Sequence, residues 1–145
     1  MPTSLLLAFS AIKKPAIGVI ILEVFWYGIE KISWLSFMAG DFLYLIKFAL
    51  FCWVGWIVFK GGGELMDAIK AGVLMGVITE LVDFILASIL YSGYYSFAYW
   101  VKDAFTWILI PVILSAAVFY IAKNKMNTHG QDSSSNQNKS GDQTV

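Results

Sequence analysis

The sequence predicts an all-α integral membrane protein: a bundle of four transmembrane helices with a disordered C-terminal tail. Composition is the first observation behind this prediction. Of the 145 residues, 59% are hydrophobic and only 14% are charged, whereas a soluble domain has roughly 45–50% apolar and about 25% charged residues. The second observation is that four stretches are long and apolar enough to cross a bilayer. The third is that polar residues gather near the C-terminus.

The four apolar stretches define the expected organisation of the chain. A hydrocarbon core of about 30 Å requires about 20 helical residues to cross it. One transmembrane domain, 16–122, is therefore expected to hold helices over 16–37, 42–59, 68–91 and 104–122. Residues 1–15 are expected to form an interfacial segment. Residues 123–145 are expected to form a disordered cytoplasmic tail, because this segment lacks the apolar side chains needed for a core.

Short segments with turn or capping residues separate the expected helices. Gly40 ends the first span, and Asp41 is suited to cap the second helix. Three consecutive glycines at 61–63 break the chain after the second span. Asp103 is expected to cap the fourth helix. The first two spans are thus predicted to form a tight antiparallel hairpin with its turn near Gly40.

The distribution of lysine predicts the orientation in the membrane. The side that holds both termini and the 60–67 loop carries six lysines near span ends, against Lys102 in the loops of the other side. The six are Lys13, Lys14, Lys60, Lys70, Lys123 and Lys125. By the positive-inside rule, we expect a multi-pass protein of the cell membrane with both termini in the cytoplasm.

Cysteine, histidine and net charge exclude several classes of protein. Cys52 is the only cysteine, so the chain has no internal disulfide. His129 is the only histidine and lies in the polar tail, which excludes His-based zinc, haem and Ser-His-Asp chemistry near the membrane. The formal charge is zero, which argues against a nucleic-acid partner. We expect no cofactor, no resident metal and no enzymatic activity.

Charged side chains within the expected spans are the main functional signal. Each costs roughly 2.5–3.5 kcal/mol near the bilayer centre, and such residues usually face protein or water. They form a candidate proton or cation site of five residues: Glu23, Glu30, Lys47, Glu80 and Asp83. Glu23 and Glu30 lie seven residues apart and therefore share one helical face. Glu80 and Asp83 lie three residues apart and share a face in the same way. A turn near residue 40 places Lys47 opposite Glu30, so Lys47 is expected to pair with Glu30 or Asp83.

Small residues in the third span predict a helix-packing surface. Ala68, Gly72 and Gly76 recur at every fourth residue, and Glu80 and Asp83 continue the same stripe. Small side chains allow a neighbouring helix to approach closely. The two acids are therefore expected to point toward protein rather than lipid.

Two interpretations of the carboxylates remain open. In the structural one, a single acid pairs with Lys47, and the others are protonated because burial disfavours a charge. The charged residues then only fix the register of the helices in the bundle. In the functional one, they form a proton- or cation-binding site between the first and third spans that is exposed alternately to each side. Carboxylates without histidine would also suit a hard cation such as Mg²⁺ or Ca²⁺.

The first span resembles that of a known membrane family. The run Trp26-Tyr27-Gly28, followed by Lys31 and Trp34, is similar to the first helix of a widespread family of small four-span bacterial and archaeal membrane proteins of unknown function. The likeness covers about ten residues. It implies a four-helix membrane fold and no particular activity.

The run Leu22-Glu23-Val24 also resembles a second family, the small multidrug resistance exporters. Those proteins use one membrane glutamate in the first helix for exchange of protons and cations. The resemblance implies that role for Glu23.

The leading expectation for function is helix association without catalysis. Four short helices have little interior in which to hide several charges, so a homo-oligomer or an accessory subunit of a membrane complex is expected, with membrane lipids as further partners. The alternative is a small proton-coupled transporter or cation channel that uses the intramembrane carboxylates. An enzyme acting on lipid ranks third, because the spans contain no recognisable pair of nucleophile and base.

Overall fold

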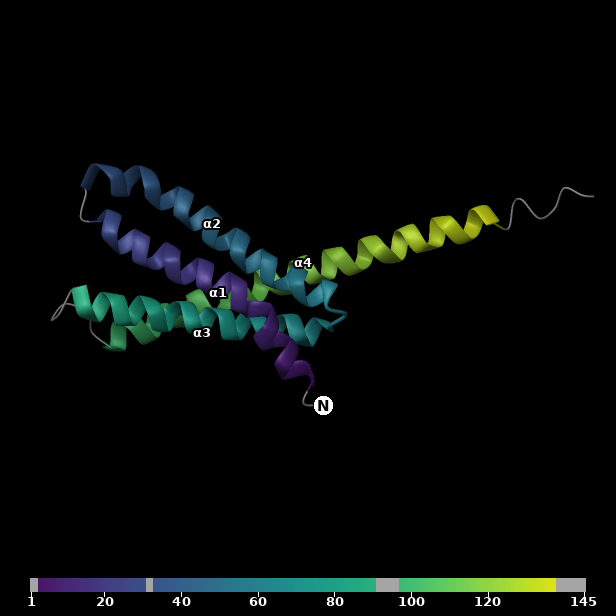
Figure 1. Cartoon of the computed structure of the whole chain (residues 1–145), viewed down its shortest axis with the longest axis horizontal. Helices are drawn as coiled ribbons and strands as arrows, with labels where there is room; N and C mark the ends of the chain where they lie inside the picture. The colour runs from purple at the N-terminus through teal and green to yellow at the C-terminus, as the bar shows by residue number, and fades with distance from the viewer. Residues whose placement is uncertain (1–2, 31–32, 91–96, 138–145) are drawn as a thin grey trace, which may run out of the picture.

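A computed structural model describes residues 3–30, 33–90 and 97–137, with side chains over 5–29, 40–90, 97 and 100–126. These residues form four helices, α1 (Thr3–Glu30), α2 (Ser33–Lys60), α3 (Leu65–Leu90) and α4 (Phe97–Gln137), which Figure 1 shows as a long bundle. The described residues contain no strand.

Each helix contains an apolar segment long enough to cross a membrane. The segments are Leu5–Ile29, Gly40–Lys60, Leu65–Leu90 and Trp100–Met126, with mean hydropathies of 1.9, 2.0, 2.2 and 2.2. The predicted all-α membrane fold with four spans is therefore confirmed.

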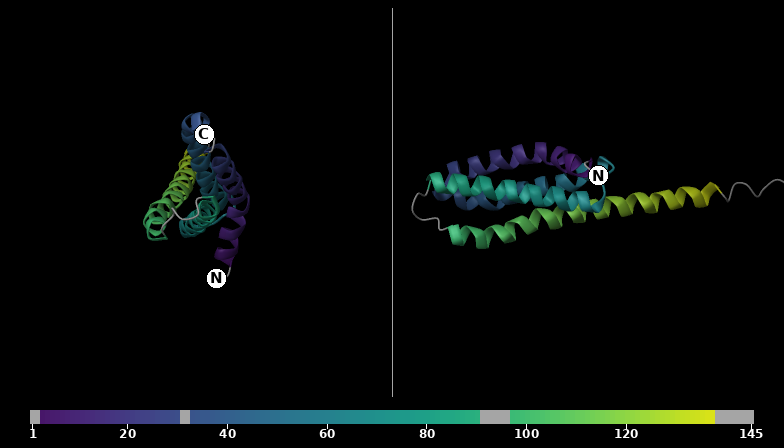
Figure 2. Two further views of the ribbon diagram at one scale, coloured as in Figure 1. Left: turned by 90° about the vertical axis from the view of Figure 1, so that its left-hand side faces the viewer. Right: turned by 90° about the horizontal axis from the view of Figure 1, so that it is seen from below.

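The helices form two antiparallel pairs that close into a ring. α1 runs beside α2, and α3 runs beside α4 (Figures 1 and 2). α1 also packs against α3, and α2 against α4, while α2 and α3 touch across the middle. All four helices thus border a shared interior, and side chains from each can meet there.

The apolar core fills the half of the bundle that contains the α2–α3 loop. Its residues come from the first half of α1, the second half of α2, the first half of α3 and the later part of α4. Phe51, Val54, Val58, Met75 and Phe119 are its large members and are almost completely buried. Glu23, Lys47, Glu80 and Asp83 lie in the other half.

Close contact between α3 and α4 depends on the small-residue stripe. Ala68, Gly72 and Gly76 are all buried. A Cβ atom on Gly72 would lie 2.7 Å from the Cα of Val112, and one on Gly76 would lie 2.8 Å from the Cα of Ile108. No side chain fits in these spaces, so the helix that the stripe admits is α4 of the same chain.

Ser115 of α4 makes a second close contact, with both α2 and α3. Its hydroxyl donates a hydrogen bond to the carbonyl oxygen of Ala68, at 3.0 Å. A Cβ on Gly55 of α2 would lie only 2.1 Å from the Ser115 carbonyl oxygen. α4 is therefore held against two neighbours at one level of the bundle.

The first two helices differ from the prediction in their boundaries. α1 ends at Glu30 and α2 begins at Ser33, so the predicted turn near Gly40 is wrong, and Gly40 and Asp41 lie inside α2. Gly40 serves helix packing instead, since a Cβ there would lie 3.3 Å from the Trp26 ring. The described part of segment 1–15 belongs to α1 rather than to a separate element.

α4 is longer than the expected span 104–122. It begins at Phe97 and continues through Lys123 to Gln137, beyond the end of the bundle (Figure 2). No proline interrupts the backbone hydrogen bonds after Pro111. A disordered tail is expected from residue 123; the structure describes helix as far as Gln137, and residues 138–145 lie outside the described residues.

Candidate functional site

A cavity of about 340 Å³ lies among the four helices, in the half of the bundle away from the apolar core. Every helix contributes residues at three- or four-residue intervals, so each presents one face to it. The lining residues are Leu22, Glu23, Trp26, Tyr27, Gly40, Leu43, Tyr44, Lys47, Glu80, Asp83, Asp103 and Trp107.

An ion pair joins α1 to α2 at this cavity. The Lys47 ammonium donates a hydrogen bond to Oε1 of Glu23, and the two side chains are only 12% and 7% exposed. The same ammonium lies 5.1 Å from the centroid of the Trp107 ring on α4. The lysine charge is thus balanced by one carboxylate and one aromatic ring.

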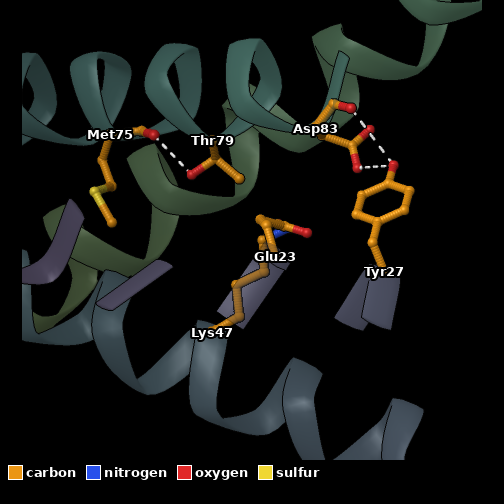
Figure 3. A network of polar contacts seen from close by, with 6 residues as sticks. All are labelled: Glu23, Tyr27, Lys47, Met75, Thr79 and Asp83. Carbon is orange, nitrogen blue, oxygen red and sulfur yellow. Dashed lines mark hydrogen bonds and ion pairs between the residues drawn. The ribbon is translucent and has the colours of Figure 1, made fainter. Parts of the chain in front are cut away.

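A hydrogen bond joins α1 to α3. The Tyr27 hydroxyl donates to Oδ1 of Asp83 at 2.7 Å, as Figure 3 shows. The hydroxyl of Thr79, one turn away on α3, donates instead to the carbonyl oxygen of Met75 in its own helix, at 2.9 Å. Tyr27 is therefore the hydroxyl of this network that bridges two helices.

Glu80 differs from Glu23 and Asp83 because, within the described part of the chain, its carboxyl group has no partner. The residue is 5% exposed and lines the cavity. No described residue forms a hydrogen bond or ion pair with its carboxyl group. Its charged neighbours are Asp83, Lys47, Asp103 and Glu23, of which only Lys47 is a cation, and Lys47 is paired with Glu23.

The three remaining acids lie at different depths. Measured along α3 from Leu90 at about 1.5 Å per residue, Asp83 is about 10 Å and Glu80 about 15 Å inside the span. Asp103 is about 4.5 Å from the Trp100 end of the α4 span, and it is exposed. The carboxyl groups form a series from the surface at Asp103 to the middle of the bilayer at Glu80.

Aromatic rings form part of the cavity wall. Tyr44 of α2 stacks on Trp107 of α4, with ring centroids 5.6 Å apart and an interplanar angle of 15°. Trp26 of α1 lies 6.4 Å from Tyr44. The cavity therefore combines acidic groups with flat apolar surfaces.

Lys47 does not pair with the residues expected for it. The expected partners are Glu30 and Asp83, whereas the structure pairs Lys47 with Glu23, and Asp83 accepts its hydrogen bond from Tyr27. The earlier end of α1 explains the difference, because it moves every residue of α2 toward lower-numbered residues of α1. The Glu30 side chain lies outside the described residues.

Sequence reasoning missed part of the cavity lining. Asp103 is interpreted as a helix cap, but it lies inside α4 and faces the cavity together with Trp107, one turn away. The other lining residues that the sequence did not single out as site residues are Leu22, Trp26, Tyr27, Gly40, Leu43 and Tyr44. The available signal is periodicity, since all of them except Leu22, which directly precedes Glu23, lie one or two turns from Glu23 or Lys47 on the same helix.

Metal-ligand geometry distinguishes among the possible occupants. Over the described side chains, no three His, Cys, Asp or Glu residues lie close enough together to hold a metal ion. A hard cation such as Mg²⁺ needs several oxygens converging at short range. The spread of the carboxyl groups suits protons and organic cations better.

Comparison of the chain with protein-family models, with curated proteins and with solved structures finds no match. A functional proposal therefore depends on the membrane fold and on the cavity.

Proposed function

We propose that this membrane protein transports a small cation through the cavity in exchange for protons held by the cavity carboxyl groups. One observation carries the proposal: Glu80 is buried in a membrane-spanning helix, faces the cavity and has no partner among the described residues. A carboxylate in such surroundings requires a proton or a cation, because an uncompensated charge there is strongly unfavourable.

The balance of charge in the cavity supports the same proposal. Four acids and one lysine line it, and the lysine is paired with Glu23. Glu80, Asp83 and Asp103 are left without a neutralising cation in the described lining. Protons and a bound cation would compete for these groups, and that competition couples the two movements.

The position of the cavity supports transport rather than simple storage. Asp103 is exposed and gives the cavity a route to one face of the membrane. The apolar core around Phe51, Met75 and Phe119 closes the other half of the bundle. A transporter has this asymmetry in one of its two states, with the site open to one side and sealed from the other.

Helix association has less support as the primary function. Its main sequence evidence is the stripe of Ala68, Gly72 and Gly76, and these residues contact α4 of the same chain. They are not available to a second copy or to another subunit while α4 occupies them.

The proposal can be tested with the full-length protein reconstituted into liposomes. The liposome lumen is acidic and contains a trapped dye that reports its pH. An external organic cation that enters in exchange for protons should raise the luminal pH. A panel of singly and doubly charged organic cations is added outside. Protein-free liposomes measure the change in luminal pH caused by neutral amine that crosses the lipid, and this change is subtracted.

Glu80→Gln should abolish the change in luminal pH, because it removes the proton that is exchanged. Glu64→Gln is the matched control, since Glu64 is an exposed acid just before α3 at the opposite end. The proposal is wrong if no cation of the panel acts above the protein-free level, or if Glu80→Gln behaves like the wild type.

A further inference from the structure

Lys47 shows which kind of cation the cavity accommodates. It places a primary ammonium group on a flexible methylene stem inside the cavity, with its N–H groups directed at the Glu23 carboxylate and its charge over the Trp107 ring. The chain itself thus supplies an alkylammonium ion to one part of the lining. Among the described residues, no ammonium group pairs with the remaining carboxyl groups of the lining, and Asp83 accepts a hydrogen bond from the Tyr27 hydroxyl.

The Trp107 ring of the cavity wall is already engaged. The Trp107 ring has Tyr44 stacked on it and the Lys47 ammonium above it. This leaves little of the Trp107 ring for the charge of a quaternary ammonium ion, which depends on aromatic faces because it has no N–H to donate. The charge of the ligand must instead be met by carboxylate oxygens, and these bind N–H donors best.

Glu80 is the strongest such acceptor. It is 5% exposed, faces the cavity and is unpaired within the described part of the chain. Asp83 lies about 4.5 Å from it along α3, and Asp103 lies closer to the surface. A ligand with a single positive charge at Glu80 leaves the charges of Asp83 and Asp103 uncompensated. A second positive charge on the ligand, nearer the surface, offsets one of these two negative charges.

The dimensions of the cavity limit the size of the ligand. Its volume of about 340 Å³ lies near the lower end of the roughly 300–1,000 Å³ typical of small-molecule sites. A chain of three or four methylenes separates two ammonium groups by a distance comparable to the steps between the acids. Its methylenes can contact the Trp26 and Tyr44 rings.

We propose that the cavity binds a short linear aliphatic diamine as its diammonium ion, with one ammonium at Glu80 and the other toward Asp83 and Asp103. This inference rests on the proposed transport function and names its substrate class. It predicts selectivity for two charges over one, and for N–H-bearing ammonium over quaternary ammonium.

The test is isothermal titration calorimetry on the full-length protein in lipid nanodiscs at neutral pH. The probes are 1,4-diaminobutane, n-butylamine and tetramethylammonium. We expect 1,4-diaminobutane to bind at least about tenfold more tightly than n-butylamine, because it makes a second charge-assisted contact. Tetramethylammonium should bind more weakly than either.

Two variants and a control locate the site. Glu80→Gln should weaken 1,4-diaminobutane binding by about tenfold or more, while Glu64→Gln should leave it unchanged. Asp103→Asn serves as a second variant, because Asp103 is exposed and its replacement does not disturb packing. It should reduce the preference for the diamine over n-butylamine.

The outcomes separate this inference from the transport proposal. If n-butylamine or tetramethylammonium binds as tightly as the diamine, or if Glu80→Gln has no effect on diamine affinity, the substrate class is wrong, even where cation–proton exchange is observed. If the diamine binds selectively but no cation moves protons in liposomes, the site stands and the transport function falls.

Discussion

The Lys47 ammonium of α2 and the Glu23 carboxylate of α1 form a nearly buried ion pair within the membrane-spanning part of the bundle. Removing one partner leaves the other charged and uncompensated. We expect Glu23→Gln and Lys47→Met each to lower the free energy of unfolding by about 3 kcal/mol. Thermal unfolding in detergent, followed by circular dichroism, measures the loss.

The double variant distinguishes a coupled pair from two separate effects. Glu23→Gln combined with Lys47→Met removes both charges, so its stability should recover most of the way to that of the wild type. A double variant as unstable as the sum of the two single variants would show that the pair does not stabilise the hairpin as a unit.

The hydrogen bond from Tyr27 to Asp83 links α1 to α3. Tyr27→Phe removes the hydroxyl and keeps the ring, and we expect it to lower the free energy of unfolding by about 1 kcal/mol. Tyr120→Phe is the matched control, because Tyr120 is 59% exposed on α4. Equal melting temperatures for the two variants would contradict a stabilising role of the Tyr27 hydroxyl.

Glycine substitutions should have opposite effects at two positions. A Cβ on Gly55 would lie 2.1 Å from the carbonyl oxygen of Ser115, so Gly55→Ala must push α2 and α4 apart. We expect a loss of about 2–3 kcal/mol. A Cβ on Gly28 would meet no atom within 4 Å, and Gly28→Ala should gain about 0.5–1 kcal/mol from the lower entropy of the unfolded chain. If the melting temperatures of Gly55→Ala and Gly28→Ala shift in the same direction, the close packing of α2 against α4 at Gly55 is wrong.

The number and type of helices could be predicted from the sequence because long apolar stretches have few alternatives in a membrane. The turn between α1 and α2 could not. Lys31 and Ile32 separate the two helices without a glycine or proline, whereas Gly40 and Asp41 carry the usual turn signal. Glycine has two uses in such proteins, at turns and at helix contacts, and local sequence does not distinguish them.

The candidate site could be predicted in part for a related reason. Glu23, Lys47, Glu80 and Asp83 stand out because charges are rare in apolar helices, and all four line the cavity. The pairing depended on the register between helices, which follows from the position of the turn. Asp103 was missed because an acid near a helix start fits a cap as well as a cavity wall.

Orientation in the membrane is predicted from the placement of lysine, and the structure shows which segments lie together at the lysine-rich end of the bundle. Leu7 lies against Gly61 and Gly63, so the start of α1 is beside the α2–α3 loop. Lys13 and Lys14 lie within the first span, but both are exposed, and their long side chains can reach the interface at that end. The lysine-rich end therefore contains the start of α1, the α2–α3 loop and the extension of α4.

Cysteine labelling in intact cells tests this orientation without altering any lysine. Cys52 is first replaced by serine, so that the chain has no other thiol. Ser92→Cys, between α3 and α4, should react with a membrane-impermeant maleimide from outside. Ser133→Cys, beyond the last span, should react only after the cells are lysed, because the positive-inside rule retains the lysine-rich end in the cytoplasm. The reverse pattern would place the Asp103 opening of the cavity on the cytoplasmic side.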